Sequence, residues 1–193
     1  MEPAQFKELI LQSLFHEKGG VLVYQTAISC AVNKQLRQEW TKYLAQTQRH
    51  VKVLTDICTA LGFDPGEDTP GCHVITHTGK SLVIAMQMAR AEGDAAAAEL
   101  VACDAVLLAE TKDHANWELI GECAKGMRGR TADMLKAAHQ EIEEEEDEHL
   151  YHSQGWGREL WLKALGLKAV LPPPEEKQDV KSAADAQRAR QSR

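Results

Sequence analysis

Apolar side chains recur every three or four residues along four long stretches of the chain, the spacing that places them on one face of an α-helix. These stretches cover residues 3–31, 36–61, 94–125 and 131–153. Pro3 suits the first turn of the first stretch, and Asn33 and Gly62 bracket the second with a start and a stop signal. Strand patterns are negligible, so the sequence predicts an all-α fold.

The links between these helices predict how they are arranged. Residues 63–79 are rich in Gly, Pro, Asp and Thr, and a shorter helix is expected at 81–91. Short first-to-second and third-to-fourth links make antiparallel pairs, whereas the long middle link can return the chain along the length of a four-helix bundle. An up-down-up-down bundle and a solenoid of helix pairs are the alternatives, although no internal repeat is visible.

Two further features concern the ends and a possible bend. A short amphipathic helix at 158–165 completes a domain of residues 1–168, and residues 169–193, which contain three consecutive prolines, are predicted to be a disordered polar tail. Gly19 and Gly20 interrupt the first helix, which indicates a bend or a close approach to a neighbouring helix.

Charge and cysteine usage narrow the class of protein. The formal charge of −7 argues against a nucleic-acid partner, which needs a surplus of Lys and Arg. Five dispersed cysteines without a CxxC indicate no disulfide framework. The first residues do not match the pattern of a signal peptide, and we expect no membrane span, because the most apolar stretch is too short. We therefore expect a cytoplasmic protein. Cys72, His73 and His77 could bind a metal, but their spacing matches no strong zinc pattern.

Charged or titratable residues occupy the apolar seam of each predicted helix. Four of them, all but Glu146, lie seven residues from seam positions on both sides, which points them inward. The residues are Glu17 in the first helix, His50 in the second, Glu110 in the third, and Glu146 with His149 in the fourth.

Buried carboxylates without partners are too costly to expect, and a metal ion supplies the missing positive charge. Glu146-x-x-His149 places two ligands one turn apart, and carboxylate with imidazole suits iron or manganese. Most of the acidic run at 141–148 must still be a solvated face, because an apolar stripe is only ~100° wide. The coincidence across four helices predicts a metal centre.

With these motifs the sequence resembles the ferritin-like superfamily, and within it the YciF-like group of bacterial stress proteins. The resemblance covers about residues 9–151 and rests on residues 17–24, on 44–62, on Glu110-x-x-Asp113 and on Glu146-x-x-His149. It implies a ferritin-like bundle with one long crossover, in which Glu17, His50, Glu110, Glu146 and His149 are metal ligands. Thr47 departs from the pattern, because the second helix of the family carries a Glu there.

The missing carboxylate leaves the number of metals open at one or two iron or manganese ions per chain. Asp113 or His114 could move into the vacancy, whereas a histidine hydrogen-bonded at the helix surface is the simpler interpretation of His114. By resemblance, the activity is Fe(II) oxidation or the reduction of oxygen or peroxide under stress. Bundles of this kind often pair, so we expect a homodimer.

Two other functions stay open at this point. A bundle whose site has degenerated through Thr47 would be a structural or partner-binding module, with Trp156, Trp161 and Leu162 as a docking surface. Iron storage in a cage is the third interpretation, although the C-terminal helix and tail do not resemble the cage-forming pattern.

Overall fold

The computed structural model describes residues 1–192, and it is all-helical in that range, as predicted. Five long helices are followed by two short ones. Their bounds are α1 Pro3–Cys30, α2 Lys34–Leu61, α3 Pro70–Ala91, α4 Ala95–Gly126, α5 Arg130–Ala164, α6 Pro174–Lys177 and α7 Ala183–Gln191.

Side-chain caps explain where three of the long helices begin. Asn33 accepts hydrogen bonds from the backbone N–H groups at the start of α2, Asp94 does the same for α4, and Thr69 does so for α3. These oxygens satisfy N–H groups that have no partner within the helix. Gly62 ends α2 in the left-handed conformation that favours glycine.

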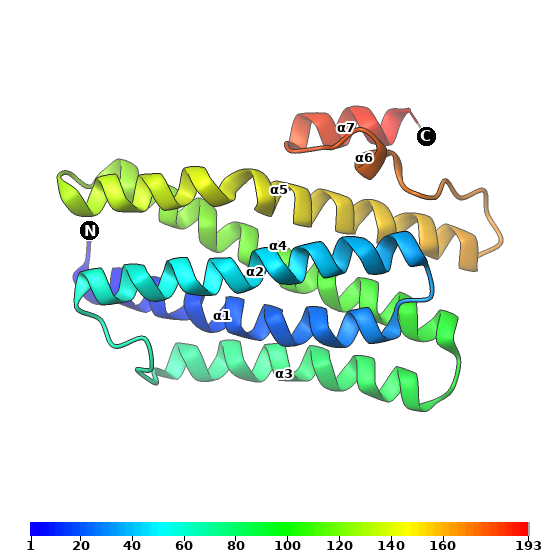
Figure 1. Cartoon of the computed structure of the whole chain (residues 1–193), viewed down its shortest axis with the longest axis horizontal. Helices are drawn as coiled ribbons and strands as arrows, with labels where there is room; N and C mark the ends of the chain where they lie inside the picture. The colour runs from blue at the N-terminus through cyan, green and yellow to red at the C-terminus, as the bar shows by residue number, and fades with distance from the viewer. Residues whose placement is uncertain (193) are drawn as a thin grey trace.

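Four of the long helices form a ring of neighbours. Both α1 and α5 contact α2 and α4, whereas α3 lies outside this ring against α1 and α4. Successive helices run in opposite directions along the long axis (Figure 1), so α2 and α4 are parallel and α3 returns the chain between them along the whole bundle. The all-α bundle is thus confirmed, and the long middle link is a full helix.

The buried apolar residues fall into two clusters along the bundle. One contains Tyr24, Tyr43 and Val106, and the other contains Leu14, Leu54 and Ile142. On each of α1, α2, α4 and α5 the predicted polar seam residue lies, in sequence, between a residue of one cluster and a residue of the other. A polar layer therefore separates two apolar halves.

The short helix expected at 81–91 is wrong in length, because α3 begins at Pro70. The glycines of this segment serve close packing within a helix and do not form turns. Gly71 faces the side chains of Glu8 and Gln12 on α1, and a Cβ on Gly79 would lie 3.6 Å from the Gly19 Cα. The close approach predicted at Gly19 is therefore with α3.

The break expected between a helix at 131–153 and another at 158–165 is absent, because α5 is continuous over 130–164. Two glycines between the expected helices make room for neighbours. A Cβ on Gly155 would lie 2.7 Å from Glu175 Oε2, and one on Gly157 would lie 4.0 Å from the Cys103 Cβ.

The described part of the expected disordered tail instead folds back onto α5. Arg158 on α5 donates to both carboxylate oxygens of Glu175, at 2.6 and 2.8 Å, and Val180 and Ala189 are buried. The polar composition of residues 169–193 predicts disorder, because composition does not show which few residues make contacts with α5. None of the described helices combines the length and apolarity required to cross a lipid bilayer.

Candidate metal centre

The predicted inward-facing residues of the four ring helices converge in the polar layer. Glu17 on α1 and His50 on α2 are fully buried, and Glu110 on α4 and Glu146 and His149 on α5 are at most 3% exposed. The helical repeat explains this burial. On each helix, the turns before and after the polar residue carry core residues on the same face, so the polar residue must also face inward.

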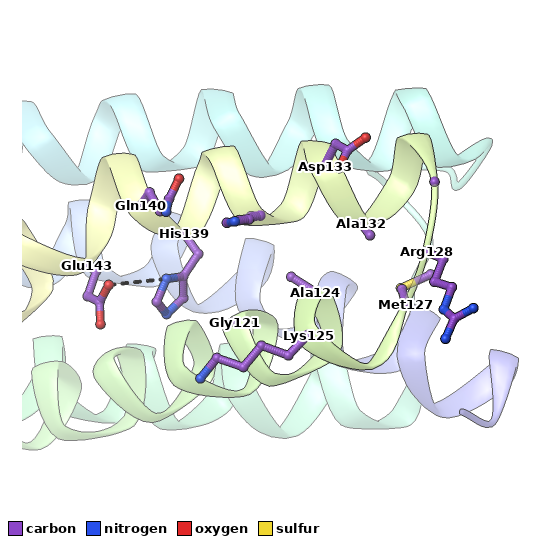
Figure 2. Close-up of a pocket in the computed structure, with 12 residues that line it drawn as sticks. Gly121, Ala124, Lys125, Met127, Arg128, Ala132, Asp133, His139, Gln140 and Glu143 are labelled. Carbon is purple, nitrogen blue, oxygen red and sulfur yellow. Dashed lines mark ion pairs between the residues drawn. The ribbon is translucent and has the colours of Figure 1, made fainter.

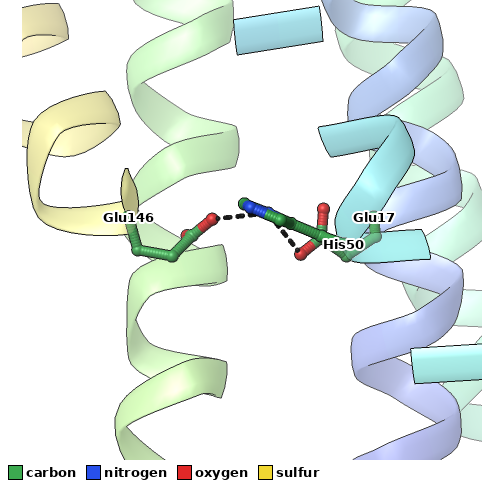
Figure 3. A group of neighbouring side chains, drawn as sticks. All are labelled: Glu17, His50 and Glu146. Atoms are coloured by element: carbon green, nitrogen blue, oxygen red, sulfur yellow. Dashed lines mark ion pairs between the residues drawn. The ribbon is translucent and has the colours of Figure 1, made fainter. Parts of the chain in front are cut away.

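One group joins α1, α2 and α5. His50 Nδ1 lies 3.3 Å from Glu17 Oε1 and 3.1 Å from Glu146 Oε1. Figure 3 shows the imidazole between the two carboxylates, which reach it from opposite sides. The three ligand atoms of Glu17, His50 and Glu146 lie within 4.8 Å of one another, close enough to share one metal ion.

A second group joins α4 and α5 and uses the same glutamate. His149 Nδ1 lies 3.3 Å from Glu110 Oε2 and 3.8 Å from Glu146 Oε1. Glu110, Glu146 and His149 also offer ligand atoms within 4.8 Å of one another. Glu146 therefore belongs to both groups and lies between them.

The outer nitrogens of both histidines are held by hydrogen bonds. His50 Nε2 lies 2.9 Å from Glu145 Oε2, and His149 Nε2 lies 3.0 Å from Gln46 Oε1. An acceptor at Nε2 favours the tautomer that carries its proton there, which leaves the Nδ1 lone pair directed at the centre. Both imidazoles are thereby oriented so that Nδ1 could accept a metal ion.

Several atoms of the centre have no hydrogen-bond partner among the described residues. They are Glu17 Oε2, His50 Nδ1, Glu110 Oε2 and both carboxylate oxygens of Glu146. Glu17 Oε1, in contrast, accepts a 2.8 Å hydrogen bond from Trp117 Nε1. Buried acceptors without donors are costly, and a cation bound in this layer would offset that cost.

The titration of the buried groups reflects the same excess of negative charge. Burial, with the neighbouring Glu17 and Glu110, raises the pKa of Glu146 to about 7, although His50 and His149 oppose the shift. Burial lowers the pKa of His50, but Glu17, Glu145 and Glu146 outweigh it and raise that pKa well above its usual value. The centre therefore retains protons that a metal could replace.

Glu110 and Asp113, one turn apart on α4, have pKa values shifted in opposite directions. Burial opposes ionisation of Glu110, but His149 lowers its pKa below the usual value. Asp113 has its pKa raised well above the usual value by burial and by the nearby Glu17 and Glu146. Asp113 Oδ1 has no hydrogen-bond partner within residues 1–192, yet Asp113 belongs to neither group of ligand atoms.

Other sequence candidates lie outside the two groups. His114 turns outward, and its Nε2 lies 2.7 Å from Asp147 Oδ1. Thr47 is buried, and its Cγ2 would lie 3.3 Å from a Cβ on Gly20, so a small side chain on α2 meets a glycine on α1. Cys72 is buried, whereas His73 pairs with Asp68 at 2.8 Å. The described cysteines are free, as predicted.

The residues that orient the candidate ligands carry no clear signal in the sequence. Gln46 and Glu145 hold the two histidines, and Trp117 holds Glu17. Gln46 lies four residues before His50, one turn away on the same helix. Glu145 lies beside Glu146, within an acidic run in which most residues are solvated. A further group, Glu39, Glu148 and His152, also brings ligand atoms within 4.8 Å, although Lys42 already pairs with Glu148.

Comparisons with known proteins do not assign this chain to a family. No family model, no curated protein and no solved structure matches it.

Proposed function

We propose that the protein is a ferritin-like metal-binding protein that holds one or two iron or manganese ions in the centre between α1, α2, α4 and α5. The activity we propose for it is Fe(II) oxidation coupled to the reduction of oxygen or peroxide. The observation that carries the proposal is the position of Glu146, which lies within reach of His50 and Glu17 on one side and of His149 and Glu110 on the other.

The residues present fit such a metal in number and in chemistry. Three carboxylates and two imidazoles match the donors that iron and manganese accept in helical bundles. The unpartnered oxygens of Glu17, Glu110 and Glu146 would obtain a cation, which offsets the cost of burying them. Glu17, His50 and Glu146 would hold one ion, and Glu110, Glu146 and His149 would hold another.

When bound, iron would supply the one-electron chemistry that no side chain of the centre provides. The protein orients the ligands, through Trp117 for Glu17 and through Glu145 and Gln46 for the two histidines. The rings of Tyr24 and Tyr43 lie 6.1 and 4.3 Å from that of His149 and exclude water on that side. Such a dry setting strengthens each charge interaction within the centre.

Metal content per chain is the decisive measurement. The protein is loaded with Fe(II) or Mn(II) under argon, desalted and analysed by mass spectrometry. Glu146→Ala/His149→Ala is the test variant, and Asp56→Ala/Glu122→Ala, at exposed positions on α2 and α4, is the control. We expect one or two ions in the wild type and the control, and none in the test variant. Absence of metal from the wild type would refute the proposal.

Activity is tested separately from binding. The Fe(II)-loaded wild type should consume oxygen or peroxide faster than Glu146→Ala at equal iron. Metal binding without faster oxidation would leave a metal-binding bundle that is not an oxidoreductase.

A degenerate, partner-binding bundle is the competing interpretation. It requires exposed tryptophans as a docking surface, but the tryptophans mostly contact other residues of the chain. Trp156 is buried and donates to Glu176, and Trp161 donates to Asp104 at 3.1 Å. Trp156 is thus occupied within the chain, and the docking surface expected around 156–162 shrinks to Trp161 and Leu162.

A further inference from the structure

A cavity between α4 and α5 reaches the centre from outside. It has a volume of about 220 Å³, and its lining includes Glu146 and Trp117 from the buried layer together with Glu118, Glu143 and Asp147. Glu146 is 1% exposed, and neither of its carboxylate oxygens has a hydrogen-bond partner among the described residues. An unpartnered buried carboxylate thus forms part of the wall of an accessible cavity.

The carboxylates that line this cavity form a graded series from solvent to centre. The side chains of Glu118 and Glu143 are 68% and 59% exposed, that of Asp147 is 18% exposed, and that of Glu146 is 2% exposed. The described lining contains no lysine or arginine. The lining also contains His114 and His139, but its four carboxylates outnumber them. A cavity with such a surplus of negative charge focuses the field and concentrates cations.

We infer that this cavity is the route by which hydrated divalent cations reach the centre, an inference that rests on the metal-binding function proposed above. Its volume corresponds to roughly seven water molecules at their share of liquid volume, which is enough for a cation with its first hydration shell. Glu146 receives the ion at the inner end, where its oxygens replace water ligands.

Two other cavities fit a cation less well. One of about 470 Å³ lies on the opposite side of α5 and reaches Gln46 and Glu145, but Lys42 and Lys181 also line it. Another, of about 530 Å³, lies near the α4–α5 turn (Figure 2), where Lys125, Arg128 and Lys136 outnumber the acids in its lining. Both place positive charge along the path.

His139 and Glu143 separate the basic cavity from the acidic one. Both residues line both cavities, and His139 Nδ1 lies 3.4 Å from Glu143 Oε2 (Figure 2). Farther in, the His114–Asp147 pair borders the route, and Ala183 at the start of α7 lines it from the C-terminal segment. The mouth is therefore built from α4, α5 and α7.

Adjacent residues on α5 provide a matched test. Glu143 lines the acidic cavity, whereas Glu144 lines the cavity on the other side. We would mix metal-free protein with Co(II) in a stopped-flow instrument, follow tryptophan fluorescence, and measure the final cobalt per chain. Glu118→Lys/Glu143→Lys should slow Co(II) uptake about 10-fold or more at low salt, because charge steering changes on-rates by at least that factor. The final stoichiometry should not change.

The control is Glu141→Lys/Glu144→Lys, which changes the net charge equally on the opposite side of the helix. Uptake by this control should stay within about twofold of wild type, and added NaCl should slow wild type more than Glu118→Lys/Glu143→Lys. If the double lysine variant does not fold, as judged by circular dichroism, Glu118→Gln/Glu143→Gln and Ala183→Trp, which obstructs the mouth without charge, take its place.

The outcomes separate this inference from the function on which it rests. Unchanged uptake in the acidic-cavity variants, or equal slowing in the control, would overturn the route while leaving the metal centre intact. A loss of bound cobalt in Glu118→Lys/Glu143→Lys would also overturn it, since these residues would then be ligands. No cobalt in the wild type would overturn both.

Discussion

His50 and His149 lie on different helices, yet they present the same ring atom to the same oxygen. Their rings stack with centroids 5.9 Å apart, and the two Nδ1 atoms lie 3.1 and 3.8 Å from Glu146 Oε1. Each ring donates from Nε2 to a separate acceptor on its far side. Both histidines therefore face the same carboxylate, and Glu146 is the residue that joins the two groups.

The metal-free protein should lose stability as the pH rises. Because burial raises the pKa of Glu146 from its ordinary 4.5 to about 7, the native state binds more protons than the unfolded state between those values, and the free energy of unfolding falls with pH. The raised pKa values of His50 and His149 act in the same direction above pH 6.5. The loss ascribed to Glu146 is at most about 3 kcal/mol.

The free energy of unfolding can be measured in urea, with EDTA present, at about one-unit pH intervals from 5 to 8. Glu146→Gln should flatten the profile, because the amide cannot ionise. A wild-type stability that is constant or that rises over this range would contradict the assigned titration.

Metal binding should stabilise the folded protein. At a free metal concentration ~100 times Kd, the gain is about 2.7 kcal/mol for one site. For a chain of 193 residues this corresponds to an increase in Tm of roughly 5–10 °C. Scanning calorimetry with Mn(II) or EDTA measures it, and Glu146→Ala/His149→Ala should show no difference between the two conditions.

Trp117 should report on occupancy of the centre. Its indole N–H donates to Glu17 Oε1, and its ring lies 6.0 Å from that of His50. A paramagnetic ion in the centre should quench its fluorescence, and Trp117→Phe should remove most of the metal-dependent quenching. Loss of this hydrogen bond to a carboxylate should also cost about 2 kcal/mol of stability. Trp161→Phe, far along α5, is the matched control and should keep the quenching.

Thr47→Glu tests the missing carboxylate. Thr47 is buried opposite Gly20, one turn before His50, so a longer acid there would enter the polar layer. We expect it to destabilise the metal-free protein by a few kcal/mol, since another buried charge is added. Equilibrium dialysis with Mn(II) should show higher affinity or a second ion, whereas Thr47→Gln, of equal length, should show neither.

The pair between Arg158 and Glu175 should hold the C-terminal segment. Arg158→Met leaves the carboxylate of Glu175 buried without its main partner, and breaking such a pair costs about 3–5 kcal/mol. The cost falls on the docking of residues 169–192, so limited proteolysis should cut there first. Lys163→Met, an exposed neighbour on the same helix, should leave the cleavage pattern unchanged.

The helical repeat was sufficient to predict the long helices of the bundle and the inward position of its polar residues. It was insufficient wherever glycine serves close packing. Gly71 and Gly79 fall within the predicted loop at 63–79, because their neighbours on other helices cannot be read from the sequence. The anchoring of the tail by Arg158 and Glu175 is likewise a contact between segments that composition does not encode.

The candidate ligands were predictable because each disturbs an apolar stripe within its own helix. Their supporting residues were not, since Gln46, Glu145 and Trp117 lie where polar or core residues are ordinary. His114 and Asp113 illustrate the limit of spacing, because one helical turn does not determine whether a side chain joins a ligand group or points past it.

Because α5 is one continuous helix, it fixes the candidate ligands and the cavity linings relative to one another. It directs Glu146 and His149 inward, Glu143 and Asp147 toward one cavity, and Glu144 toward the other. A single residue inserted before Glu143 would turn everything beyond it by about 100°. The insertion would turn Glu146 and His149, the acidic lining and Arg158 away from their present partners at the same time. We therefore expect α5 to tolerate substitutions far better than any change in its length.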